Sequence, residues 1–405
     1  MNHMNSRTVL GLGTATLLAI VAAVVITTAR KPVIEIAERA PYAFPELRDH
    51  INEVKSLTIV GAGNTSLVTV EHGDQGWALK ERSGYPADLG QVRPLLLRLA
   101  EVRLREKKTA NEQRYAELGV EDISQPDAKG LLLKVHGLAQ PVQVIIGKAS
   151  ARGDGTFIRR PDDRQSWLIE SALSVVKEPA AWLERNLADI APDRVKEVAL
   201  RRPDGKTLRL FKQAGDANFK VADLPKGREL LSESAANSLG AVLSGLRLED
   251  VQPARDAEPP ADGTTYHARF TTFDGLVVAI TAWKKDDKNF GRFEAGVDPA
   301  LADAYVQSEQ AKAKTDYEAK QSKAASSETP RPTEPPPLAV SDPVKDREHR
   351  LAALETELAP LKQRFVGWTF TLPAHTFSPL DQSLEDLLKP MERGKAGGKK
   401  ATRSN

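Results

Sequence analysis

The sequence predicts an α+β protein in which one β-rich unit occurs twice behind a single N-terminal transmembrane helix. Three observations support this class: an uncharged apolar run over residues 8–29, strand-like runs separated by turn residues, and landmarks that recur at a nearly constant spacing. We therefore expect two tandem α+β repeats, each with an antiparallel sheet and one main helix. A helical and disordered insertion should interrupt the second repeat.

The run from Thr8 to Ala29 has no charged residue and lies between Arg7 and Arg30. As a helix it would extend about 33 Å, enough to cross the hydrocarbon core of a membrane. A cleaved secretory signal is the alternative, although such signals have a shorter apolar core. We expect an uncleaved single-pass anchor in a cell (inner) membrane, with the rest of the chain outside the cytoplasm. The flanking charges oppose this orientation, because more basic residues follow the run than precede it.

The first repeat should open with β-branched strands at residues 56–60 and 66–70, followed by a third at residues 77–80. Asp88 is the expected N-cap of the main helix, and Pro94 should kink this helix or move its start. The apolar face of the helix comprises Val92, Leu95, Leu96, Leu99 and Val102. Four more strands and a short closing helix are expected at residues 131–136, 142–146, 156–159, 167–170 and 179–190.

The second repeat is predicted from landmarks that return 141 to 144 residues later. The matching pairs are Val54 with Val195, Gly73 with Gly215, and Val102 with Leu246. A helix capped by Ser232 should present an apolar face formed by Ala235, Leu239, Val242, Leu243 and Leu246. Strands are expected at residues 207–211, 266–273, 276–283, 290–294 and 368–372.

The insertion contains two helices joined by a Pro-rich disordered linker over residues 322–343, whose composition cannot form a core. Leucines at spacings of three and four follow it and predict a short coiled-coil seam, cut by Pro360. These leucines are Leu351, Leu354, Leu358 and Leu361. The expected order is tail, anchor, linker, first repeat, second repeat, insertion, closing part of the second repeat and disordered basic tail. The corresponding residues are 1–7, 8–29, 30–53, 54–192, 193–296, 297–365, 366–390 and 391–405.

Composition excludes several classes of site. With 57 Lys and Arg against 55 Asp and Glu, the net charge is +2, which excludes a broad nucleic-acid footprint. The chain has no cysteine, so disulfides, thiolate metal sites and cysteine nucleophiles are impossible. The histidines lack metal-ligand spacing, and Gly147-Lys148 lacks the rest of a phosphate-binding loop. We predict no catalytic, cofactor-binding or metal-ligating residue and no cofactor.

Short motifs along the first repeat suggest a family. They are Trp77-Ala78-Leu79, Tyr85-Pro86-Ala87-Asp88 and Tyr115-Ala116-Glu117-Leu118-Gly119. With the preceding anchor and the apolar helix, this order resembles the family called domain of unknown function 4340, over residues 50–300 and 366–388. The long insertion departs from the usual pattern. The resemblance implies a setting beside ABC-type exporter or gliding-motility-type auxiliary components, and it implies no enzymatic activity.

We therefore expect a non-catalytic, membrane-anchored accessory or scaffold protein of an envelope ABC-type transport or motility-like system. Its expected partners are the membrane and an ABC-type permease or auxiliary membrane protein, without nucleic acid. The alternative is an extracytoplasmic ligand-binding protein or an envelope hydrolase whose site is built from distant residues. The candidate interaction residues are Leu351, Leu354 and Leu358, on a seam expected to be exposed, and Arg103 and Arg105 in a basic run.

Overall fold

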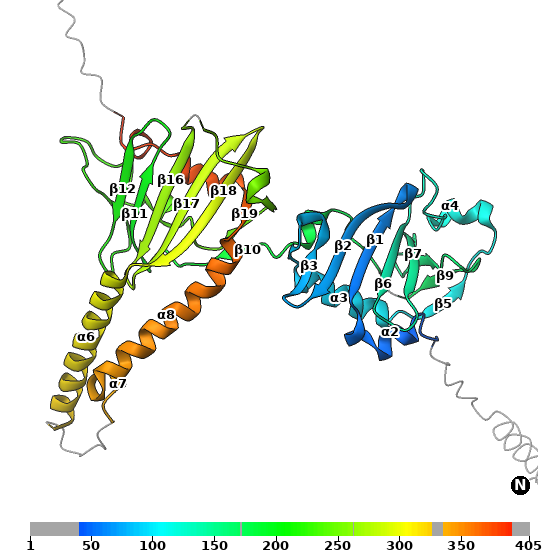
Figure 1. Cartoon of the computed structure of the whole chain (residues 1–405), viewed down its shortest axis with the longest axis horizontal. Helices are drawn as coiled ribbons and strands as arrows, with labels where there is room; N and C mark the ends of the chain where they lie inside the picture. Colours follow the sequence, from blue (N-terminus) through cyan, green and yellow to red (C-terminus); the bar gives the residue numbers. More distant parts are fainter. Residues whose placement is uncertain (1–39, 171, 262, 326–334, 391–405) are drawn as a thin grey trace, which may run out of the picture.

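The computed structural model describes residues 40–170, 172–261, 263–325 and 335–390. The predicted anchor (8–29), the basic tail (391–405) and residues 326–334 of the predicted disordered linker (322–343) lie outside these residues. Elsewhere in that linker the prediction is corrected, because residues 322–325 and 338–341 are helical. Within the described ranges, no helix has both the length and the apolar character needed to cross a membrane. The α+β class is confirmed, because two large antiparallel sheets with several helices form the two lobes of Figure 1.

The first unit contains a nine-stranded sheet. Its strands are β1 (Ser56–Gly61), β2 (Thr65–Gly73), β3 (Gly76–Leu79), β4 (Tyr85–Pro86), β5 (Leu104–Lys107), β6 (Leu131–His136), β7 (Val142–Ala149), β8 (Thr156–Arg159) and β9 (Ser166–Ile169). Its helical segments are α2 (Pro45–Asp49), η1 (Ile51–Glu53), η2 (Ala62–Asn64), η3 (Lys80–Arg82), α3 (Leu89–Ala100), η4 (Glu112–Arg114), α4 (Tyr115–Leu118) and η5 (Pro179–Trp182). The strand order is β4-β3-β2-β1-β6-β7-β8-β9-β5.

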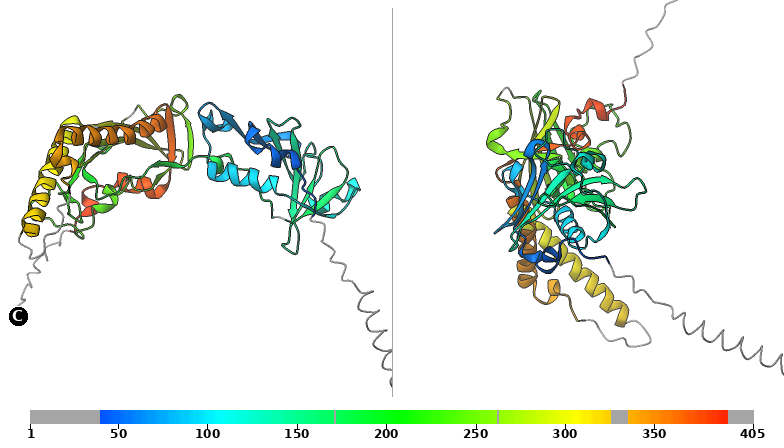
Figure 2. Two further views of the ribbon diagram at one scale, coloured as in Figure 1. Left: turned by 90° about the horizontal axis from the view of Figure 1, so that it is seen from below. Right: turned by 90° about the vertical axis from the view of Figure 1, so that its right-hand side faces the viewer.

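The main helix of the first unit, α3, packs against one face of this sheet (Figure 2). It starts where the sequence predicts, since the Asp88 carboxylate accepts a hydrogen bond of 2.7 Å from the Gly90 amide. Pro94 lies inside the helix and does not move its start. The predicted apolar face is buried: Val92, Leu95, Leu96, Leu99 and Val102.

The second unit contains an eight-stranded sheet. Its strands are β11 (Val195–Arg201), β12 (Thr207–Phe211), β13 (Lys220–Val221), β15 (Asp250–Pro253), β16 (Thr265–Thr272), β17 (Leu276–Lys285), β18 (Lys288–Val297) and β19 (Trp368–Leu372). A separate short pair joins β10 (Asn186–Ala188) to β14 (Leu246–Arg247). The smaller helical segments are α5 (Asn237–Gly240), η6 (Ala254–Asp256), α9 (Ala374–Asp381) and η7 (Glu385–Leu387).

The two sheets have the same topology, as the repeated landmarks predict. The order β13-β12-β11-β16-β17-β18-β19-β15 matches β3-β2-β1-β6-β7-β8-β9-β5 strand for strand, and β4 is an additional edge strand of the first sheet. Hydrogen bonds outside the sheets repeat as well. Leu104 donates to the Pro41 carbonyl at 2.9 Å, and Leu248 donates to the Arg185 carbonyl at 3.0 Å.

The pairing register makes individual residues equivalent. Leu57 lies opposite Val70 and Val135, just as Val198 lies opposite Leu210 and Phe270. Following the register across both sheets equates Arg159 with Arg292. Both arginines donate to backbone carbonyls of an equivalent loop, which joins β5 to β6 in the first unit and β15 to β16 in the second. Arg159 binds the Val120 carbonyl at 2.9 Å, and Arg292 binds the Ala257 carbonyl at 2.9 Å.

Three local predictions are corrected. Residues 40–53, assigned to the linker, form α2 and η1, and they bury Phe44 and Leu47 in the first unit. The helix expected after Ser232 is reduced to α5, because turns replace most of it, although its apolar residues are still buried or half-buried. The closing helix expected at residues 179–190 is instead η5 followed by β10, which pairs with β14.

The insertion forms a helical arm composed of α6 (Pro299–Ala325), α7 (Leu338–Ser341) and α8 (Pro343–Phe365). It joins β18 to β19, at the position of the β8–β9 turn in the first unit, and projects from one end of the second sheet (Figure 1). The α8 helix continues past Pro360 and packs against β18. Its Phe365 ring lies 5.3 Å from that of Phe293.

The two units meet at a joint formed by η3 and β4 on one side and β15 and β19 on the other. Arg82 donates to both carboxylate oxygens of Asp250, at 2.5 and 2.9 Å. The buried Tyr85 ring packs edge-on against Trp368 at 5.1 Å, and burial raises the pKa of its hydroxyl. Buried side chains of both units therefore belong to one continuous cluster. The Tyr85-Pro86-Ala87-Asp88 motif thus supplies both the joint and the cap of α3.

Candidate interaction surface

The predicted leucine seam lies within the protein's own fold. Leu354 and Leu358 are 7% and 1% exposed, and Leu351 is half-buried against the same core. The expectation of an exposed seam is therefore wrong: these side chains attach α8 to the second unit. The prediction that these leucines bind another protein remains untested. Such binding would require the arm to detach from the sheet.

The two arginines predicted with the seam are engaged inside the first unit. Arg103 donates to the Ala40 carbonyl at 2.8 Å, and its guanidinium carbon lies 3.8 Å from the centre of the Tyr42 ring. Arg105 forms an ion pair of 2.8 Å with Asp154. The structure thus places these arginines and the leucines on different units and does not bring them together.

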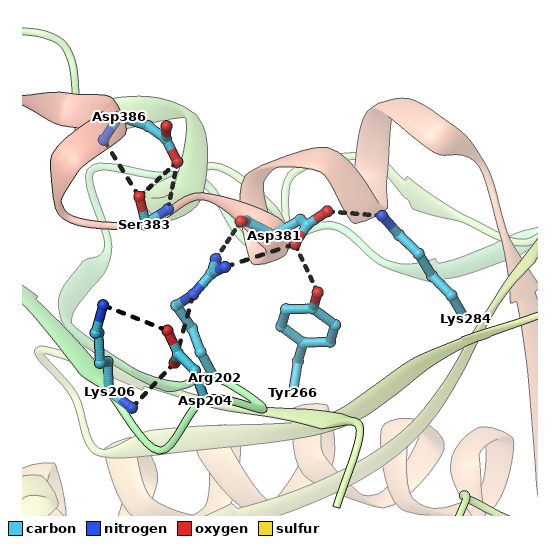
Figure 3. A network of polar contacts seen from close by, with 8 residues as sticks. All are labelled: Arg202, Asp204, Lys206, Tyr266, Lys284, Asp381, Ser383 and Asp386. Carbon is cyan, nitrogen blue, oxygen red and sulfur yellow. Dashed lines mark hydrogen bonds and ion pairs between the residues drawn. The ribbon is translucent and has the colours of Figure 1, made fainter.

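A polar network fixes α9 to the second sheet (Figure 3). The Asp381 carboxylate accepts hydrogen bonds of 2.6 Å from both Tyr266 and Lys284, while Arg202 donates to its backbone carbonyl. Burial acts to raise the pKa of Asp381, but the bonds from Lys284 and Tyr266 outweigh it and lower that pKa. Burial and the bond to Asp381 raise the pKa of Tyr266 to about 12. These groups neutralise one another, so the network serves attachment.

A second network fixes α8. The Arg194 guanidinium donates to both carboxylate oxygens of Glu357 at 2.7 Å and to Asp274 at 2.6 Å. The hydrogen bond to Glu357 is the main reason that the pKa of Arg194 is raised. This bidentate geometry joins the arm, the start of β11 and the β16–β17 turn.

One face of the second sheet remains open to solvent. Tyr266 and Lys284 point toward α9, and because side chains alternate along a strand, their neighbours point to the opposite side. We call this side the open face and define it by Glu197, Ala199, Arg201, Arg209, His267, Arg269, Ala279 and Thr281. Arg201, Arg209, His267 and Arg269 are exposed on it.

The register places three arginines of the open face around one alanine. Ala199 lies directly opposite both Arg209 and Arg269, and Arg201 lies two residues further along the same strand. Arg209 pairs with Glu197 at 3.1 Å. Within the described part of the chain, Arg201 and Arg269 have no ion-pair or hydrogen-bond partner for their guanidiniums. Sequence reasoning missed this cluster, although the polar positions of β11 and β16 carried the signal as alternate residues.

One end of the equivalent face of the first sheet is covered. The counterparts of Arg201, His267 and Thr281 are Val60, Leu132 and Ile145, which are 5%, 7% and 1% exposed. A second hydrophobic cluster buries them beneath side chains of the loop that contains α4, namely Tyr115, Val120 and Ile123. The shorter loop around η6 leaves β11, β12 and β16 uncovered on the open face.

The charged groups that line one cavity of the second unit all have partners within the fold. A cavity of about 450 Å³ between β10 and α8 is lined by Asp189, Glu357 and Arg364 among others. All three are engaged: Asp189 with the Gly245 amide, Glu357 with Arg194, and Arg364 with the Leu187 carbonyl. Over the residues that the structure covers, no group of three or more His, Asp or Glu side chains has a geometry that could hold a metal ion.

Comparisons with known proteins give one match. No curated protein and no solved structure matched the chain. A family model described as "Domain of unknown function (DUF4340)" matches residues 77–269, from β3 of the first unit to β16 of the second. The match therefore includes η3, β4 and β15 of the joint, the connection between the units and the start of the open face. Over these residues the chain is similar to the DUF4340 family, as its short motifs predict.

Proposed function

We propose that this chain is a non-catalytic accessory protein that acts by binding another protein at the open face of its second sheet. The observation that carries the proposal is the contrast between two equivalent sheet faces. The first unit buries Val60, Leu132 and Ile145 under its own loop, whereas the second unit leaves Arg201 and His267 exposed and Thr281 half-buried at the same positions. Among the described residues the guanidiniums of Arg201 and Arg269 have no partner, so they do not stabilise the fold. Binding of another protein would explain why they are placed there.

The setting belongs to the same proposal. An anchor at residues 8–29 would hold the two units at the surface of the cell (inner) membrane, outside the cytoplasm. Confinement raises the effective concentration of a binding face toward a membrane partner, so a modest contact suffices. An envelope ABC-type permease or an auxiliary protein of a motility-like system fits this arrangement, and the family resemblance supports it.

The test is partner identification from membranes. The full-length chain with an affinity tag is expressed, cross-linked in intact cells, solubilised in detergent and purified. We expect a defined membrane protein of a transport or motility-like assembly to be enriched. The matched control carries the same tag on residues 1–39 alone, which retains the predicted anchor without the two units. Equal recovery with the control, or recovery of no partner in repeated preparations, would contradict the proposal.

A further inference from the structure

We infer that the open face binds an acidic surface of a partner protein, through the arginine triangle of Arg201, Arg209 and Arg269. This inference deepens the proposed function and rests on it. The triangle is defined by the register: Arg201 is the diagonal neighbour of both other arginines, at about 7 Å between Cβ atoms, across adjacent strands.

The triangle carries an unbalanced positive charge. Among the residues that the structure describes, only the Arg209 guanidinium of the three has an ion-pair partner, Glu197. Like charges on neighbouring strands destabilise a sheet, so the isolated chain gains nothing from placing Arg201 and Arg269 there. A carboxylate set between them would relieve the repulsion and accept bidentate hydrogen bonds from the planar guanidinium forks.

The surroundings of the triangle favour protein carboxylates over a polyanion. Glu197 lies inside the face, and Glu294 lies opposite Ala279 at its edge, exposed and two strands from Arg269. These two acids would repel the continuous charge of a phosphodiester backbone or an anionic bilayer. A protein surface carries both signs and can place its carboxylates on the arginines and its cations on Glu197 and Glu294.

The floor of the face suits a flat contact between proteins. Ala199 and Ala279 are small and half-buried, so they let a partner approach the backbone between the arginines. At one edge the Phe211 side chain, opposite Glu197, is 40% exposed and offers apolar area beside the charges. Arginine and aromatic side chains together are the composition found at the energetic centres of protein interfaces.

The test measures binding of a defined acidic probe to the full-length chain in detergent. The probe is a labelled peptide of alternating glutamate and serine, and its neutral equivalent has glutamine in place of glutamate. We expect Arg201→Ala with Arg269→Ala to weaken binding of the acidic peptide about tenfold at low ionic strength. The matched control, Arg93→Ala with Arg247→Ala, removes the same charge from exposed arginines away from the face and should retain binding.

A charge exchange separates recognition from altered folding. Arg201→Glu with Arg269→Glu should lose the acidic peptide and gain binding of an alternating lysine and serine peptide, a gain that misfolding cannot produce. Three results would overturn the inference: no binding by the unaltered chain, equal weakening by the control pair, or failure of the exchanged variant to gain the lysine peptide. Stronger arginine-dependent binding to phosphatidylglycerol vesicles or to a single-stranded oligonucleotide would overturn the partner class.

These outcomes are distinct from failure of the proposed function. If the cross-linking experiment identifies a partner and the alanine pair still captures it fully, the inference fails while the accessory role stands. If the acidic peptide binds as expected and no partner is recovered from membranes, the accessory role fails instead.

Discussion

The two units use one sheet topology and treat its second face in opposite ways. In the first unit, residues 108–130 separate β5 from β6, and their side chains bury Val60, Leu132 and Ile145. In the second unit, residues 254–264 make the equivalent connection and reach only the β17–β19 side, where Trp283 is fully buried. The difference shows that loop length decides which face of a repeated sheet is available, because the strands themselves are equivalent.

The other face of each sheet packs against helices, and the two units differ in which helices cover it. The first unit uses α3, which directly precedes β5 in the chain. The second unit has only α5 at that point and takes additional cover from α8 and α9, which arrive later in the chain. The insertion therefore substitutes for the shortened main helix, and the comparison can be tested through the residues that provide each cover.

The largest change in stability is expected when the packing of α8 against the second sheet is weakened. Leu358→Ala should lower the free energy of unfolding by about 3 kcal/mol, because it leaves a cavity in the core of the second unit. Val344→Ala, at a 69% exposed position of the same helix, should change it by less than about 0.5 kcal/mol. Denaturant unfolding of both variants measures this. Equal effects would show that α8 does not belong to the core.

A smaller effect is expected when the loop over the first sheet loses a contact. Ile123 is 3% exposed in the second cluster, and Ile123→Ala should cost about 2 kcal/mol. The matched change on the open face of the second sheet is Thr281→Ala, which should stay within about 0.5 kcal/mol. Denaturant midpoints compare the two. A costly Thr281 variant would mean that the open face is covered after all.

The next prediction compares the stability contributions of Arg159 and its equivalent, Arg292. Arg159 is 3% exposed and donates to Val120 as well as to the Asp122 carboxylate at 2.5 Å, whereas Arg292 is half-buried. Arg159→Met should therefore cost about 2 kcal/mol and Arg292→Met about 1 kcal/mol, as charged hydrogen bonds to buried carbonyls are lost. Thermal unfolding of each variant checks the order. The reverse order would contradict the assigned difference in burial.

The smallest effect concerns pH. The pKa of Asp381 is lowered in the folded protein, so its ion pair stabilises the fold above the unfolded pKa of about 4, and this contribution disappears as the pH falls through the folded value. Because the carboxylate is one-third exposed, solvent screening limits the contribution to about 1 kcal/mol. Asp381→Asn should remove that part of the acid dependence in unfolding between neutral and acidic pH. An unchanged dependence would contradict it.

Much of this architecture could be predicted from residue patterns, because runs rich in β-branched residues are separated by turns that carry glycine. The strands at residues 131–136, 156–159, 207–211 and 368–372 were predicted with their observed bounds. The prediction of a full helix after Ser232 was wrong because its apolar spacing also fits a series of tight turns over a sheet. The prediction of an exposed leucine seam was wrong for a related reason. Spacing reveals an apolar stripe on α8, but it does not reveal which residues pack against that stripe.

The candidate site was harder to predict, since it depends on long-range register. Arg201, Arg209 and Arg269 lie on three different strands and meet only when β12, β11 and β16 pair. Arg103 and Arg105 stood out because they belong to one short basic run, yet each one has a partner inside the first unit. Clustering along the chain was therefore a poor guide to clustering on the surface.

The unequal treatment of the two sheet faces has a consequence for how the chain can evolve. Substitutions among Val60, Leu132 and Ile145 change the stability of the first unit, so selection for folding restrains them. The equivalent positions Arg201, His267 and Thr281 contribute little to folding and are free to change with a partner. We therefore expect related chains to diverge fastest on β11 and β16 at alternate residues, and more slowly at the equivalent positions of the first unit.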